Sequence, residues 1–132
     1  MTAFPHAVVW IDHHEARIIF FNREESDEKI VKPAHARHHL HSKTGSGARA
    51  PEDHAFYETV AKTVSEATED FLVAGPANAK TEFVKHLHRH VPRLVEKLAG
   101  VETMAKVTDG ELLAAARHYF QAAIWKLPAQ TA

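Results

Sequence analysis

The chain has 132 residues, which fits one domain large enough to fold without disulfides or metals. Its 16 Lys and Arg and 17 Asp and Glu give a formal net charge of −1, so no global field attracts nucleic acid, although 12 histidines would make it cationic in mild acid. The lack of cysteine excludes thiolate metal sites and a cysteine nucleophile, and no signal peptide or membrane-spanning run is visible, so we expect a cytoplasmic protein.

The first part of the chain predicts strands. Residues 6–12 and 16–21 are short runs rich in β-branched and aromatic residues, and the polar turn between them indicates a β-hairpin. After an acidic turn, residues 29–32 predict a third, short strand, and Pro33 ends the regular structure.

A long loop is predicted at about residues 33–51. This segment has one large aliphatic residue, Leu40, so it cannot contribute much to a core. Long loops inside small domains tend to be functional or disordered. Residues 29–51 contain no acid and five cations, which are Lys29, Lys32, Arg37, Lys43 and Arg49.

Helical periodicity begins after this loop. Residues 51–53 predict the helix start, and apolar residues recur at helical spacing through residues 56–67. Glu58 and Lys62 are expected to form an outward-facing pair one turn apart.

Further elements alternate along the second half. Residues 71–74 predict a buried strand, and Asn78 is expected to cap a second helix, which Pro92 interrupts. A short further helix is expected to end at Gly100, followed by a last strand over residues 101–107.

The final helix has the clearest start signal. Thr108 and Glu111 match the capping box, in which each side chain binds the other residue's backbone N–H. The order of elements predicts a single α/β domain over residues 1–132. Its mixed sheet is expected to start with an antiparallel hairpin, continue with parallel strands and be covered by helices.

Histidines raise the question of a metal site. Imidazole is a common transition-metal ligand, but a loop without Cys or acids predicts weak binding, so a metal-binding role of the loop stays an alternative. The loop histidines in question are His35, His38, His39 and His41. His86 and His90 lie one helical turn apart, but neighbouring Lys85, Arg89 and Arg93 would repel a cation, which favours a solvated face.

Catalytic patterns are weak. Asp12 ends the first strand, where nucleases built on a similar hairpin hold Mg²⁺, but two-metal chemistry needs several clustered carboxylates. Glu58, Glu82 and Asp109 show no spacing signature for such a cluster, and no G-x-S-x-G is present. We therefore expect neither catalysis nor a cofactor.

Residues 42–47 read S-K-T-G-S-G, but the phosphate-loop arrangement G-x-x-x-x-G-K-[ST] is absent. Small residues there would let the backbone approach another surface, and nearby cations favour phosphate. The loop is thus predicted either to contact RNA or to be a linker. The RNA-contacting residues would be Arg37, His38, His39, His41, Lys43, Gly45, Gly47 and Arg49.

Three segments carry a family resemblance. They are V-V-W-I-D at 8–12 followed by A-R-I at 16–18, F-L-V-A-G-P-A-N-A-K-T-E-F at 71–83, and T-D-G-E-L at 108–112. Over about residues 6–124 the chain resembles the middle domain of the archaeo-eukaryotic release factors and Pelota, including short bacterial homologues labelled translational machinery proteins. The resemblance implies an RNase-H-like fold and a role at the ribosome.

In the release factors, the loop before the first helix carries Gly-Gly-Gln, which promotes peptidyl-tRNA hydrolysis. The matching residues 43–49 read K-T-G-S-G-A-R, and the glutamines of the chain are Gln121 and Gln130. We therefore expect a non-catalytic protein associated with the ribosome or ribosomal RNA, of a stress, hibernation or rescue type, without a membrane partner. The alternatives are a histidine-rich metal binder, or an adaptor that pairs through a sheet edge or through Trp125 and Leu127.

Overall fold

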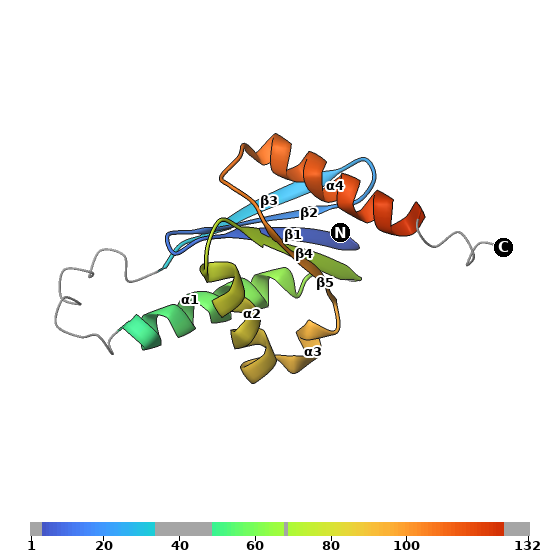
Figure 1. The fold of residues 1–132 in the computed structure, drawn as a ribbon. Helices are drawn as coiled ribbons and strands as arrows, with labels where there is room; N and C mark the ends of the chain where they lie inside the picture. Colours follow the sequence, from blue (N-terminus) through green and yellow to red (C-terminus); the bar gives the residue numbers. More distant parts are fainter. Residues whose placement is uncertain (1–3, 34–48, 68, 126–132) are drawn as a thin grey trace.

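The computed structural model describes residues 4–33, 49–67 and 69–125, and for residues 49–53 and 122–125 it describes the backbone only. Within these ranges one sheet is covered by helices on both faces (Figure 1). The strands are β1 (His6–Ile11), β2 (Ala16–Phe21), β3 (Ser26–Val31), β4 (Asp70–Gly75) and β5 (Leu98–Thr103). The helices are α1 (Arg49–Val64), α2 (Ala79–His90), α3 (Pro92–Val95) and α4 (Asp109–Trp125).

The sheet has the strand order β3-β2-β1-β4-β5. The central strand β1 pairs antiparallel with β2, where Val8 lies opposite Ile19, and parallel with β4, where Val8 lies opposite Leu72. The pairing of β2 with β3 is antiparallel, and that of β4 with β5 is parallel. The predicted α/β class, with a mixed sheet that starts as an antiparallel hairpin, is confirmed.

The two faces of the sheet bury different helices. In Figure 1, α1, α2 and α3 lie on one face and α4 lies on the other. Because side chains alternate along a strand, Ala7, Val9 and Ile11 of β1 pack toward α1 and α2, whereas Val8 and Trp10 pack toward α4. The helical residues on the first face include Phe56, Val60, Phe83 and Leu87, and those on the second are Leu112, Ala116 and Phe120.

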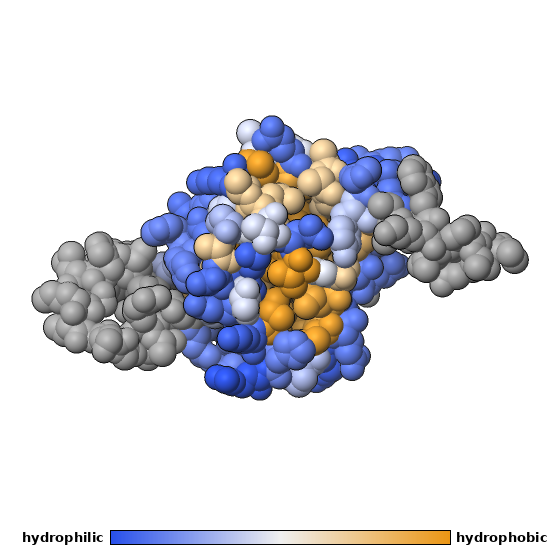
Figure 2. All heavy atoms as spheres, in the orientation of Figure 1, coloured by the Kyte–Doolittle hydropathy of each residue, from blue (hydrophilic) through white to orange (hydrophobic). Residues whose placement is uncertain are grey.

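One stretch of the surface is apolar. Figure 2 shows hydrophobic residues beside β5, between α3 and α4. Val101 on β5 is 42% exposed. None of the helices in the described ranges combines the length and apolar character needed to span a bilayer.

Two element boundaries at the loop differ from expectation. β3 begins at Ser26 rather than at residue 29, because it pairs with β2 along its whole length, from Phe21 opposite Ser26 to Ala16 opposite Val31. α1 begins at Arg49, so Pro51 is its third residue, where the missing N–H costs no helical hydrogen bond.

The predicted helix ending at Gly100 is wrong. α3 has only four residues, and residues 98–100 already belong to β5, which pairs with β4 from Leu98 opposite Phe71 onward. The predicted strand to Val107 is also too long, since β5 ends at Thr103. The chain then connects β5 to α4, which lies on the other face of the sheet from α1, α2 and α3 (Figure 1).

The two predicted helix N-caps have different outcomes. Asn78 occupies the N-cap position of α2 but makes no side-chain capping hydrogen bond, so that predicted cap is wrong. The capping box of α4 is confirmed: Glu111 N donates to Thr108 Oγ1 at 3.1 Å, and Thr108 N donates to Glu111 Oε1 at 2.9 Å. These hydrogen bonds stabilise the carboxylate and lower the pKa of Glu111.

Candidate functional site

The loop predicted to contact RNA falls almost entirely outside the described residues. Arg49 is the first residue of α1, with its backbone described. The others lie outside the described ranges: His35, Arg37, His38, His39, His41, Lys43, Gly45 and Gly47. The structure does fix where the connection starts and ends, at Val31 on the outermost strand β3 and at Arg49.

One cation near the loop is already used within the fold. Lys29 Nζ on β3 lies 3.0 Å from Glu66 Oε1, just after α1, and 5.7 Å from the ring centre of Phe20. The ion pair links β3, which precedes the predicted loop, to the residue segment just after α1, which follows that loop. Lys29 therefore contributes less free positive charge than the sequence alone indicates.

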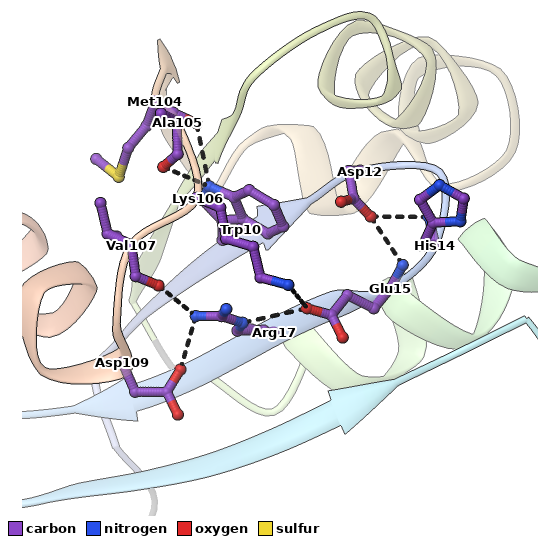
Figure 3. Close-up of polar contacts among 10 residues, drawn as sticks. All are labelled: Trp10, Asp12, His14, Glu15, Arg17, Met104, Ala105, Lys106, Val107 and Asp109. Carbon is purple, nitrogen blue, oxygen red and sulfur yellow. Dashed lines mark hydrogen bonds and ion pairs between the residues drawn. The ribbon is translucent and has the colours of Figure 1, made fainter.

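A polar network joins β2 to the start of α4 on the other face (Figure 3). Arg17 Nη1 donates to the carbonyl oxygen of Val107 at 2.7 Å and to Asp109 Oδ1 at 2.9 Å. Its Nε donates to Glu15 Oε2 at 3.3 Å, and its guanidinium lies 5.4 Å from the ring centre of Trp10. Arg17 is thus held on several sides, and the network acts as an anchor for the connection into α4.

Asp12, weighed above as a magnesium ligand, is engaged in the hairpin turn. Its Oδ1 accepts hydrogen bonds from the backbone N–H groups of His14 at 2.7 Å and Glu15 at 2.9 Å (Figure 3). This arrangement is that of an Asx turn, which stabilises the link between β1 and β2.

The other carboxylates weighed for metal are separately paired. Glu82 Oε1 accepts from the Tyr57 hydroxyl at 2.9 Å, Asp109 binds Arg17, and Glu58 binds His86. Within the part of the chain that the structure describes, these carboxylates and Asp12 form no common group of potential metal ligands.

A cavity of about 550 Å³ lies between the β2–β3 turn and α4. At its wall, His6 Nδ1 lies 2.5 Å from Asp70 Oδ1, and the His6 ring stacks on Phe120 with centroids 4.8 Å apart. Arg117 also lines it, but its guanidinium donates to backbone carbonyl oxygens of the turn at 3.2 Å. These polar groups are therefore occupied in holding α4 to the sheet.

Three histidines gather between α1 and α2. His54 of α1 lies 4.9 Å from His86 and 4.8 Å from His90 of α2, measured between ring centroids, and the last two rings are 4.7 Å apart. His86 is only 7% exposed, and its ring lies 5.9 Å from that of Tyr57. Its Nε2 is 3.0 Å from Glu58 Oε1.

This grouping corrects two expectations. Glu58 contacts His86 rather than forming the predicted outward pair with Lys62, because the packing of α1 against α2 brings the carboxylate to the imidazole. His86 lies in this helix interface and not on the solvated face predicted for it. Sequence reasoning missed His54; the available signal was its one-turn spacing from Glu58, which parallels that of His86 and His90.

The environment of His86 favours the neutral imidazole. Burial lowers the pKa of His86, and the neighbouring His90 and His54 lower it further, while the hydrogen bond to Glu58 acts in the opposite direction. A neutral ring keeps one nitrogen lone pair available at neutral pH.

Comparison with known proteins gives a consistent family likeness. No protein-family model matches the chain. The chain is 29% identical to the Pelota homolog of Thermococcus onnurineus (strain NA1) over an alignment of 119 residues, which covers 71% of this chain and 33% of that protein. The chain therefore spans about a third of the length of this curated relative.

Solved Pelota structures share the fold. The crystal structure of Archaeoglobus fulgidus Pelota matches 96% of this chain and 35% of its own, with a TM-score of 0.65 and 17% identity. The Thermoplasma acidophilum Pelota protein matches 80% of this chain and 29% of its own, with a TM-score of 0.57 and 13% identity. At these identities the likeness shows the fold, and together with the sequence match it confirms the resemblance to Pelota inferred from the sequence.

Proposed function

We propose, from the likeness to Pelota, that this protein is a translation-factor-like domain that binds ribosomal RNA and has no hydrolytic activity. Its role would be of a stress, hibernation or rescue type. The observation that carries the proposal is a Pelota-type fold in which the β3–α1 connection holds cations and no acid.

The proposed RNA binding depends on local positive charge. Phosphate contacts supply much of the affinity of proteins for nucleic acid, and they need positive charge only where the surfaces meet. The connection leaves from the outermost strand of the sheet. The ion pair between Lys29 and Glu66 links β3, which precedes the connection, to the residues just after α1. Lys43 and Arg49 are proposed as phosphate contacts, and Gly45 and Gly47 as points of close backbone approach.

The proposed absence of hydrolytic activity rests on the residues of the same segment. Residues 43–49 contain no glutamine, whereas the release factors that the chain resembles use Gly-Gly-Gln there. Release of peptide from ribosome-bound peptidyl-tRNA above the buffer background would contradict this part of the proposal.

The test is co-sedimentation with purified ribosomes at two salt concentrations. In the double variant Lys43→Glu with Arg49→Glu, we expect weaker binding and a salt dependence reduced by about 2 in the slope of log K against log salt. The new acid at residue 49 lies at the positive end of the α1 dipole, so the fold is expected to tolerate it.

A matched control reverses two charges away from the loop. Arg23 is exposed in the β2–β3 turn, and Lys62 is exposed in the last turn of α1, so Arg23→Glu with Lys62→Glu changes the net charge equally. Loss of binding in the loop variant alone supports the proposal. Equal binding by wild type and loop variant, or equal losses in both variants, contradicts it.

A further inference from the structure

We propose that His54, His86 and His90 form a binding site for a divalent transition-metal ion of the Zn²⁺ class. The site lies between α1 and α2 and is independent of the proposed ribosomal role. It uses none of the loop histidines considered above.

The geometry brings three ligand atoms together. One nitrogen from each ring lies within 4.8 Å of the other two. Two nitrogens bound to one tetrahedral Zn²⁺ at about 2.0–2.1 Å stand roughly 3.3 Å apart, so the rings must close by on the order of 1 Å. His54 and His90 are exposed and have room for this movement, whereas His86 is held in the helix interface.

The placement on two helices favours a defined site. His86 and His90 are one turn apart on α2, a spacing that puts both side chains on one face. His54 comes from α1, which packs against α2. Ligands held on regular elements are better fixed than ligands on a loop.

Glu58 adds the feature expected around a metal-binding histidine. Its carboxylate contacts His86 at 3.0 Å, and such carboxylate–imidazole contacts orient the ring and make it a stronger ligand. The negative charge also offsets part of the charge of a bound cation.

Nearby cations were expected to repel a metal. Lys85, Arg89 and Arg93 are all exposed, so water and salt screen their charges, while Glu58 lies against the cluster itself. The donor set of imidazoles without thiolates suits Zn²⁺, Ni²⁺ or Cu²⁺ better than Mg²⁺ or Ca²⁺.

Isothermal titration of the full chain with Zn²⁺ tests the proposal. To remove the contribution of the loop, the parent protein for the test carries alanine at four positions: His35, His38, His39 and His41. We expect this parent to bind one Zn²⁺, and His54→Ala with His90→Ala to bind at least about tenfold more weakly. Both replaced residues are exposed, so the fold is expected to persist.

Two further variants sharpen the result. The matched control His13→Ala with His14→Ala removes two exposed histidines of the β1–β2 turn and should leave Zn²⁺ binding unchanged. Glu58→Gln keeps the side-chain size but removes the charge, and should weaken binding about tenfold or more. Failure of the parent to bind Zn²⁺ at micromolar concentrations, or equal affinity in the His54/His90 variant, overturns the proposal.

The metal test and the ribosome test are separable. With the loop histidines left in place, the His54→Ala, His90→Ala variant is expected to co-sediment with ribosomes as the wild type does. If this variant, with its loop histidines intact, binds Zn²⁺ as the wild type does, and the parent without loop histidines does not bind it, the site proposed between α1 and α2 is also overturned.

Discussion

Gly75 is the last residue of β4 and lies beside the end of the central strand. It is buried, and a Cβ atom at this position would collide with the backbone carbonyl oxygen of Ile11 and would lie 3.6 Å from Lys80 Cβ. Its φ angle is not positive, so the need for glycine here is steric and not conformational. The replacement Gly75→Ala therefore forces β1 and β4 apart at one point.

The size of the effect follows from what can move. Ile11 belongs to β1, which is paired on both sides, so its carbonyl oxygen cannot yield as a flexible side chain would. Overpacking of a fixed core costs about 1–3 kcal/mol, and we expect Gly75→Ala to lower the free energy of unfolding by that amount. The Gly75-Pro76 step at the end of β4, which carries much of the family resemblance, thus has a packing reason of its own.

Urea unfolding followed by far-ultraviolet circular dichroism measures this difference by linear extrapolation. Gly110→Ala is the matched control, because Gly110 lies in the first turn of α4 and a Cβ there meets nothing within 4 Å. The control should be neutral, or more stable by up to about 1 kcal/mol. If Gly75→Ala stays within about 0.5 kcal/mol of wild type, the steric argument is refuted.

Two further predictions use the same measurement. Thr108→Ala removes one half of the capping box and should lower the free energy of unfolding by about 1 kcal/mol, whereas Thr108→Ser should retain most of it; equal stability of the two variants would contradict the capping role. The pKa of His86 is lower in the folded chain than in the unfolded chain, so the unfolded state binds the proton more tightly and folding loses stability as the pH falls below about 6.5. Between pH 7 and 5.5 the wild type should therefore lose more stability than His86→Gln does, and an equal or larger loss in the variant would argue against a buried neutral ring.

Local signals predicted some elements well. The apolar runs of β1 and β2 and the capping box of α4 could be identified from the sequence because their patterns depend on neighbouring residues. The beginning of β5 could not, since Leu98 becomes a strand residue only through pairing with Phe71, far away in the sequence. Helical spacing alone gave no reason to expect a strand there.

The histidine cluster between α1 and α2 could be predicted only in part from the sequence. The one-turn spacing of His86 and His90 is visible in the sequence, but the approach of His54 and Glu58 depends on how α1 packs against α2. The cations around α2 are visible in the sequence, whereas the carboxylate of Glu58 comes from α1 and reaches His86 only in the folded chain. The predicted RNA contacts of the loop remain a prediction.

The central position of β1 has a consequence for folding kinetics. Its antiparallel partner β2 follows after a short turn, whereas its parallel partner β4 is joined through pairs such as His6 and Asp70, which are 64 residues apart. Closing the long connection is therefore expected to limit the folding rate. Each doubling of its length costs about 0.6 kcal/mol, which slows folding roughly threefold and leaves the unfolding rate nearly unchanged. Insertions between β3 and α1 would thus lengthen the time that the newly made chain spends with one edge of β1 unpaired.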